Sequence, residues 1–386
     1  MTGRRGASAV VAALAALALV ASACGKSGGT GETKIFSSIG KGEGQLNLIA
    51  WPGYVESGQN DPKFDWVTPF EKQSGCQVNV KYADTSPQMV TLMRQSGGTI
   101  YDGVSASGNA TNLLIAHGDV AGIDVNKIIP NYDQMLPSLR APAHNTVDGV
   151  HYGVPYMYGP DFLMFNTDVV TTRPDSWDVV FKPEQLAKFK DCGVHFLDSS
   201  DDIMSGALHY LGLDPNSKRE ADYQKATDLL TRVRPAVRKF HSSEYISALA
   251  TGEICFVVGF SGDIKQSQKR ATEAKNGIEI AYAIPKEGAQ LWFDNVAIPR
   301  DARNIAEAHE FINFLQQPEV AAKNSNFVAY ANGNLASQKF INKDVLEDRT
   351  IYPDEATMAR FYTMRAHDAA TTRLMNRLWT RIKTGR

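Results

Sequence analysis

Downstream of residue 44, short hydrophobic runs alternate with stretches of helical periodicity. Residues 46–50 (Leu-Asn-Leu-Ile-Ala) form a mostly apolar run, and residues 76–82 alternate between apolar and polar side chains. Residues 278–284 alternate in the same way and stop at Pro285. Runs of this length, bounded by turn residues, predict strands.

Two helices have recognisable start signals. Ser86 and Pro87 predict an N-cap and a first helical residue, for a helix that ends at Gly97. Asn304 and Glu307 resemble a capping box ahead of a second amphipathic helix. Strands that alternate with helices of this length predict an α/β fold with mostly parallel sheets.

The first 23 residues predict an export signal. Arg4 and Arg5 precede an apolar stretch at 10–23, which ends in small residues directly before Cys24. A thiol at this position can be acylated, so the chain is expected to be a lipoprotein on the outer face of the cytoplasmic membrane, or periplasmic where an outer membrane is present. An ordinary secretory cleavage is the alternative, because Ala21 stands where lipoprotein signals usually carry a bulky aliphatic residue.

Residues 24–44 are rich in Gly, Ser, Thr and Lys and predict a flexible tether. About 360 residues follow the signal, more than one hydrophobic core usually serves, so two lobes are expected. The formal net charge of -2 gives no reason to expect a nucleic-acid partner. The only membrane association expected is through the lipid.

Three cysteines lie in the exported part, and an oxidising compartment allows two of them to pair. Cys76 opens an alternating strand pattern, which suits a small buried side chain. This favours Cys192 with Cys255 and leaves the other pairings open.

Enzyme signatures are missing from the sequence. It contains no His-Glu-x-x-His motif and no phosphate-binding glycine loop, and Gly259-Phe260-Ser261-Gly262 lacks the spacing of a nucleophile elbow. We therefore expect neither catalysis, nor a cofactor, nor a metal site.

Aromatic and acidic residues recur together at predicted strand ends. Ligands of open α/β sheets bind just beyond the carboxyl ends of strands. Aromatic faces attract ammonium groups and carboxylates accept their hydrogens, so this pattern suits an organic cation. Each residue alone has an ordinary structural explanation, and only the combination indicates a site. The segments are Trp51 with Tyr54, Asp198 to Asp202, Phe260 with Asp263, and Trp292 with Asp294.

These segments resemble the bacterial polyamine-binding proteins of ABC importers, closest to the putrescine-binding type. The resemblance covers essentially the whole chain after residue 44 and is densest from 175 to 300. The matching stretches are 175–178, 182–184, 191–198, 238–243, 252–255, 284–289, 330–332 and 377–386.

The resemblance implies a two-lobed, hinged periplasmic-binding-protein fold of type II, with the ligand in the cleft between the lobes. Lobe 1 is expected to comprise 45–154 and 297–350, and lobe 2 to comprise 155–296 and 351–386. The resemblance also implies a Cys192–Cys255 disulfide. The ligand-binding positions that it implies are Trp51, Tyr54, Ser107, Asp202, Ser242, Phe260, Asp263, Trp292, Asp294 and Tyr330.

Some positions depart from the family pattern. Pro52 and Gly53 stand where putrescine-type proteins usually have Ser-Asp, so one carboxylate is lost. Asp202 replaces a Glu, and Phe260 replaces a Trp. Residues 56–63 resemble an insertion beside the cleft. The ligand identity could therefore differ from that of the family.

The resulting hypothesis is a monomeric, non-catalytic receptor that captures a putrescine- or spermidine-class polyamine and delivers it to an ABC permease. One alternative is a receptor of the same fold for another small amine or cation. Another is a ligand sensor rather than a transport component.

Overall fold

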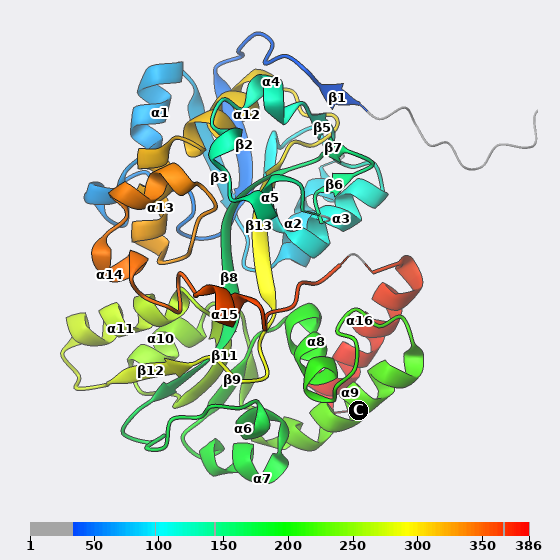
Figure 1. The fold of residues 1–386 in the computed structure, drawn as a ribbon, viewed down its shortest axis with the longest axis vertical. Coiled ribbons are helices and arrows are strands. Elements are labelled where there is room, and N and C mark those ends of the chain that lie inside the picture. Colours follow the sequence, from blue (N-terminus) through cyan, green and yellow to red (C-terminus); the bar gives the residue numbers. More distant parts are fainter. Residues whose placement is uncertain (1–33, 97, 143, 366, 386) are drawn as a thin grey trace, which may run out of the picture. The chain divides into compact units, whose positions relative to one another are not determined.

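The computed structural model describes residues 34–96, 98–142, 144–365 and 367–385. The predicted signal and Cys24 lie outside the described residues. The described chain folds into two α/β lobes, upper and lower in Figure 1, which confirms the predicted fold class. The expectation of mostly parallel sheets is wrong, because four of the eight strand pairings in the large sheet of the described residues are antiparallel. None of the helices within the described ranges has the length and apolar character to cross a bilayer.

A nine-stranded sheet extends through both lobes in the order β10-β9-β11-β8-β13-β4-β2-β3, with β12 beside β8. Strands β2, β3 and β4 are parallel in lobe 1, as are β9, β10 and β11 in lobe 2, while β8 and β13 run antiparallel to their neighbours. The strands are β2 (Gln45–Ala50), β3 (Gln77–Tyr82), β4 (Gly103–Ser107), β8 (Val154–Asn166), β9 (Val194–Phe196), β10 (Lys239–Phe240), β11 (Phe256–Phe260), β12 (Ile280–Ala283) and β13 (Leu291–Ala297).

Strand β8 connects the lobes. Residues 154–160 pair with β13, and residues 161–166 pair with β11 and with β12. Every residue of β8 is buried, as expected for a strand covered on both faces. Figure 1 shows β8 and β13 running side by side from the upper lobe into the lower one.

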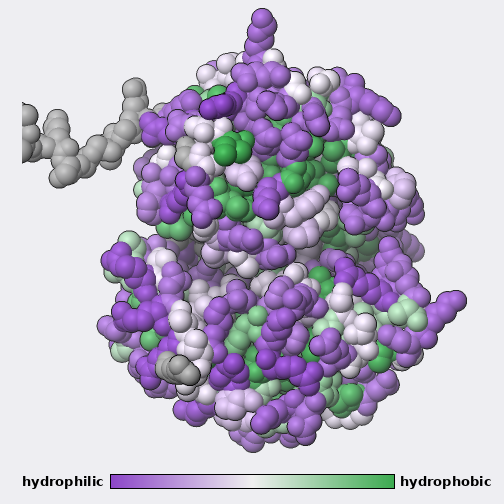
Figure 2. Space-filling model, turned by 180° about the vertical axis from the view of Figure 1, so that it is seen from behind, coloured by the Kyte–Doolittle hydropathy of each residue, from purple (hydrophilic) through white to green (hydrophobic). Residues whose placement is uncertain are grey.

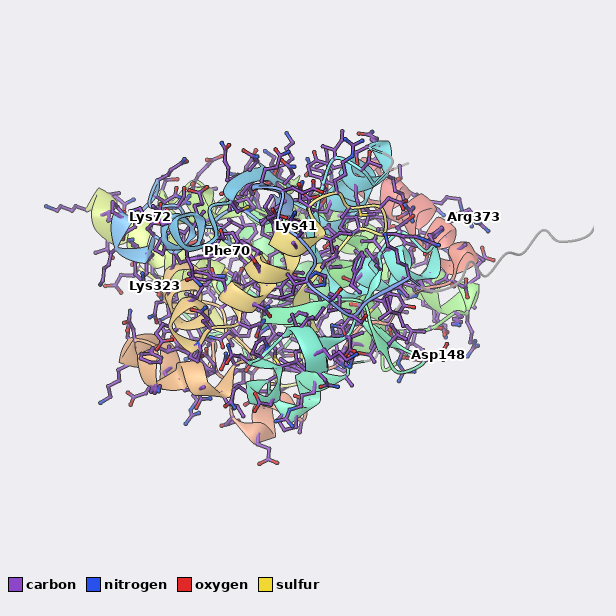
Figure 3. All side chains as sticks on the ribbon, turned by 90° about the horizontal axis from the view of Figure 1, so that it is seen from above. Lys41, Phe70, Lys72, Asp148, Lys323 and Arg373 are labelled. Atoms are coloured by element: carbon purple, nitrogen blue, oxygen red, sulfur yellow. A yellow bond between two sulfur atoms is a disulfide. The ribbon has the colours of Figure 1, made fainter. Side chains whose placement is uncertain are left out.

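Amphipathic helices cover the sheet. Phe70 of α1 is buried in the lobe 1 core, whereas Lys72 of the same helix points to solvent (Figure 3). The longer helices are α1 (Val67–Ser74), α2 (Ser86–Gln95), α3 (Gly108–Ala116), α8 (Ser200–Tyr210), α9 (Glu220–Val233), α10 (Tyr245–Ala250), α11 (Asp263–Ala274), α12 (Ile305–Leu315), α13 (Pro318–Val328) and α16 (Ala369–Thr384). The one-turn helices are α4 (Val125–Ile128), α5 (Pro137–Arg140), α6 (Asp178–Phe181), α7 (Pro183–Leu186), α14 (Lys343–Leu346) and α15 (Glu355–Met358).

The hydrophobic core divides with the lobes. One cluster joins residues 36–158 to residues 291–352, and a second joins residues 163–289 to residues 375–382. A smaller third cluster lies around α2 and β4 in lobe 1. The residue boundaries given above for the lobes stay predictions.

Helix α2 begins as expected but with a different cap. The N-cap is Thr85, whose hydroxyl accepts a hydrogen bond from the Gln88 amide at 3.2 Å. Ser86 is the first helical residue, and its hydroxyl accepts from the Ser107 amide at 3.0 Å. The side chain predicted as a local cap therefore connects α2 to the end of β4.

The predicted capping box at α12 is wrong. Helix α12 does begin after Asn304, but the side chain of Asn304 donates to Asp102 at 2.8 Å instead of capping the helix. The Glu307 carboxylate accepts from the backbone amides of Glu43 and Gly44, the latter at 2.6 Å. Glu307 thus fixes the segment that leads into β2.

Part of the predicted flexible tether is ordered. Strand β1 (Ile35–Phe36) pairs in parallel with β5 (Gly122–Ile123), and Phe36 is buried in the lobe 1 core. Burial of one aromatic ring therefore fixes a segment that its composition marked as a spacer. The same small sheet contains β6 (Thr146–Val147) and β7 (Val150–His151).

A disulfide joins Cys192 to Cys255, with a Cα–Cα distance of 5.6 Å. It ties the segment before β9 to the start of β11. Cys76 is a buried free thiol, and burial raises its pKa to about 12. A thiol of this kind is unreactive at neutral pH.

Candidate functional site

A cavity of about 400 Å³ lies between the lobes, lined by residues of both. From behind, the surface shows a furrow where the lobes meet, bordered mainly by hydrophilic residues (Figure 2). The structure brings all ten predicted ligand-binding residues to this cavity: Trp51, Tyr54, Ser107, Asp202, Ser242, Phe260, Asp263, Trp292, Asp294 and Tyr330. Their roles in binding stay predictions.

Strand ends position these side chains. Trp51 directly follows β2, and Ser107 ends β4 and is the N-cap of α3. Asp202 lies in the first turn of α8, and Asp263 is the first residue of α11 after β11. The location agrees with the rule that ligands bind beyond the carboxyl ends of strands.

Asp294 lies on β13 directly opposite Ser107 of β4. The Ser107 hydroxyl donates to Asp294 Oδ1 at 2.8 Å. Burial raises the pKa of Asp294 to about 7, against the opposing effect of the hydrogen bond from Ser107. A carboxylate buried this deeply is costly to ionise unless a cation joins it.

Asp263 connects the two lobes. It belongs to α11 in lobe 2, and Tyr330, whose ring is part of the lobe 1 core, donates its hydroxyl to Asp263 Oδ1 at 2.7 Å. The Tyr245 hydroxyl donates to the other oxygen. Burial raises the pKa of Asp263 to about 6, although both phenols favour the ionised form.

Asp202 is the third acid of the site. Its backbone amide donates to Ser199 Oγ at 3.3 Å, and the side-chain amide of Gln290 donates to Asp202 Oδ1. Burial raises the pKa of Asp202 to about 6. The negative charge of Asp202 also raises the pKa of Asp294, so the two carboxylates repel each other across the cavity.

Aromatic rings form one wall. Trp292 makes edge contacts with Phe260, at 5.9 Å between ring centroids, and with Tyr330, at 4.8 Å. The Tyr54 ring lies 6.0 Å from that of Tyr330. The buried Ser242 hydroxyl has no hydrogen-bond partner among the described residues. Rings beside carboxylates, with a spare hydroxyl acceptor, suit an ammonium group on an apolar chain.

Two acids that line the cavity, Asp84 and Glu244, were not identified from the sequence. Asp84 lies just beyond β3, where the strand-end pattern used for the other acids would have found it. Asp198 and Asp201, which belong to the predicted segment Asp198 to Asp202, also line the cavity. Glu244 and Asp198 form ion pairs with lysines. Among the described residues that line the cavity, seven are acidic, and Arg270 is the one Lys or Arg.

The first loop supplies no carboxylate at Gly53. Gly53 has a φ of 82°, in the left-handed region that favours glycine. Its neighbours Trp51, Pro52 and Tyr54 line the cavity, and Gly53 does not. The loop thus contributes aromatic surface rather than charge.

No group of three or more His, Cys, Asp or Glu side chains in the described ranges has the arrangement of a metal site. The carboxylates of the cavity are instead separated by aromatic rings and hydroxyls, which suits an organic cation better than a bare ion.

Residues 65–351 match the family model described as bacterial extracellular solute-binding protein. The chain belongs to this family. It is 37% identical over 349 residues to the putrescine-binding periplasmic protein PotF of Escherichia coli, covering 88% of this chain and 92% of PotF. It is 38% identical over 347 residues to the putrescine-binding periplasmic protein SpuD of Pseudomonas aeruginosa, with 88% and 92% covered.

A solved structure from Listeria monocytogenes, described as a spermidine/putrescine ABC transporter, has the same fold. Its TM-score is 0.77 at 28% sequence identity, and the match covers 89% of this chain and 100% of that one. These relatives are solute-binding transport proteins, and they confirm the resemblance read from the sequence.

Proposed function

We propose that this protein captures a polyamine of the putrescine or spermidine class outside the cytoplasmic membrane and delivers it to an ABC import permease. One observation carries the proposal: three carboxyls with raised pKa values, those of Asp202, Asp263 and Asp294, face one cavity beside aromatic rings. A ligand with two ammonium groups and an apolar spacer would neutralise these acids and cover the rings.

The size of the cavity supports a small ligand. A volume of about 400 Å³ lies near the lower end of the range for small-molecule sites. PotF and SpuD are named for putrescine, and both align with most of this chain. A different small amine is the second candidate, because the loop at Gly53 offers no carboxylate.

A binding role without catalysis is part of the proposal. The cavity is lined by acids and aromatic rings, and the relatives are transport proteins. Incubation with putrescine followed by mass spectrometry should return the amine unchanged. A new product would contradict this part of the proposal.

A lipid anchor at Cys24 is also part of the proposal, supported by the sequence pattern around that residue. The native protein should fractionate with membranes, and the Cys24→Ser variant should be released. If the unaltered protein is already in the soluble fraction, the anchor is wrong and secretion is the better account.

Calorimetry and thermal shift with ligand-free, refolded protein test the function. The panel is putrescine, spermidine, spermine and agmatine, with glutamate and lysine as amino-acid controls. A ligand at one hundred times its Kd should stabilise the protein by about 2.7 kcal/mol. If no amine shifts Tm or gives a heat of binding, the polyamine proposal is wrong.

A further inference from the structure

Strand β8 contains one buried acid, Asp161, which is not among the residues that line the cavity. Asp161 is 3% exposed and lies opposite Phe260 in the register of β8 with β11. Its backbone amide donates to the Gln290 carbonyl at 3.1 Å. Its Oδ1 has no hydrogen-bond partner among the described residues. A buried carboxylate in this position would be strongly destabilising.

Gln290 brings Asp161 and Asp202 together: its carbonyl accepts from the Asp161 backbone amide at 3.1 Å, and its side-chain amide donates to Asp202 Oδ1. A hydrogen bond between the two carboxyls also affects the pKa of each. Two carboxyls this close in a buried site cannot both be ionised at low cost, so one of them retains a proton. Burial, and next the charge of Asp202, raise the pKa of Asp161 well above its usual value.

The surroundings decide which acid keeps the proton. Asp202 lies in the first turn of α8, where the helix dipole favours negative charge, and it accepts the side-chain amide of Gln290. Gln290 is itself fixed by Ser205, whose hydroxyl donates to Gln290 Oε1 at 2.8 Å. Among the described residues, Oδ1 of Asp161 has no hydrogen-bond partner, and Asp202 is the group that acts on its carboxyl most strongly after burial. The proton therefore stays on Asp161, whose hydroxyl donates a hydrogen bond to the ionised carboxylate of Asp202.

Other titratable groups lie near this pair on neighbouring elements. They include Tyr245 of α10 and Tyr362, which follows α15. Burial raises the pKa of each phenol, and the charge of Asp161 raises it further. They stay neutral through the physiological range. Asp294 interacts with Asp202 from across the cavity.

We propose that Asp161 is a positioning residue: it keeps its own proton at neutral pH and donates a hydrogen bond through it to Asp202, so that Asp202 stays charged and oriented as an acceptor for one ammonium group of the ligand. The ligand part of this inference rests on the proposed function; the protonation of Asp161 does not.

Two substitutions separate the donor role from simple packing. Asp161→Asn keeps a donor of the same shape, so amine affinity should stay within about 3-fold of the parent. Asp161→Leu fills the space without a donor, and the lost hydrogen bond to a charged group should weaken binding by about 10-fold to 100-fold. Asp161→Ala provides a second donor-free variant if the leucine variant does not fold, as judged by circular dichroism without ligand.

The pH below which the protein loses its affinity for the amine distinguishes the two roles, because a change in packing alone would not shift this pH. The hydrogen bond from Asp161 lowers the pKa of Asp202. In the leucine or alanine variant, putrescine binding should therefore fail at a higher pH than in the parent, while the asparagine variant keeps the parent profile. If the Asn and Leu variants weaken binding equally, with no shift of this pH, the positioning role is wrong.

Infrared spectroscopy of the ligand-free protein tests the proton itself. At pH 8 the parent should show a protonated carboxyl band that is missing from the Asp161→Asn variant. An identical carboxyl region in the two proteins overturns the inference. A parent that shows this band but binds no amine would instead contradict the proposed function, so the two failures can be told apart.

Discussion

Replacing Asp294 with asparagine should remove one contribution to the pH dependence of the stability of the ligand-free protein. Burial raises the pKa of Asp294 from 3.8 to about 7. A shift of about 3 units corresponds to roughly 4 kcal/mol. Because the folded-state pKa is the higher one, this stabilisation is fully present below about pH 4 and is lost as the pH rises to about 7.

Asparagine does not titrate, so the Asp294→Asn variant lacks this dependence. The free energy of unfolding of the variant, minus that of the parent, should increase by about 4 kcal/mol between pH 4 and pH 8. Any constant effect of losing an acceptor for the Ser107 hydroxyl cancels in this comparison. The sign is unusual, since a substitution in a binding site makes the empty protein relatively more stable at high pH.

Urea unfolding at four or five pH values, followed by tryptophan fluorescence, measures this difference. The protein must first be refolded from denaturant to remove bound amine. Asp301→Asn is the matched control, because Asp301 is an exposed carboxylate shortly after the same strand, and its variant should follow the parent at every pH. Parallel curves for the Asp294→Asn variant and the parent would refute the burial argument.

The same Asp294→Asn variant should bind putrescine at least about 30-fold more weakly at pH 8, because removal of a buried counter-charge typically costs 2–5 kcal/mol. Calorimetry with the Asp301→Asn control measures this. If the pH dependence disappears but affinity is unchanged, Asp294 is a buried structural acid and the ligand lies elsewhere.

Three further changes test the site and the fold. Trp292→Ala should weaken binding of long amines, because contact with the ring and its cation–π attraction are lost. Calorimetry with putrescine and spermidine measures this, and unchanged affinities would mean that Trp292 is purely a core residue. Gly262→Ala should lower Tm and affinity together, because the new Cβ would lie 2.7 Å from the Tyr330 ring; an unchanged Tm would mean that the ring moves freely. Cys255→Ser should lower the free energy of unfolding by about 2–5 kcal/mol, since the disulfide to Cys192 spans 63 residues. Denaturant unfolding with and without reductant measures the difference. Equal free energies for the variant and the oxidised parent would contradict the prediction.

The strand-end pattern predicted much of the site because it reflects how α/β sheets are built. Trp51 and Asp263 directly follow β2 and the β11 region, as the sequence indicated. Asp294 was expected at a strand end but lies inside β13, and it reaches the cavity because β13 runs antiparallel to β4 and pairs it with Ser107. Asp84 follows β3 in the same way, so the same pattern predicts it. Arg270 lines the cavity from the second turn of α11, and no local pattern marks it.

Long-range partners could not be predicted. Glu307 and Asn304 matched a local capping box, but their hydrogen bonds go to backbone and side chains some 200 residues away or more. Phe36 looked like part of a spacer because its strand partner is β5. Asp161 carried a readable signal, since an acid in the middle of a long apolar strand requires a partner, but the sequence did not show that the partner is Asp202.

The placement of Asp263 links charge to lobe geometry. Its hydrogen bonds come from Tyr245 within lobe 2 and from Tyr330, which is packed in the core of lobe 1. Both bonds favour the ionised carboxyl, and burial opposes it. An ammonium group beside Asp263 would favour ionisation further and strengthen the bond from Tyr330, because hydrogen bonds to a charged acceptor are stronger than those to a neutral one. Since that bond connects the lobes, a cationic ligand would stabilise their association, whereas a neutral solute of the same shape would not.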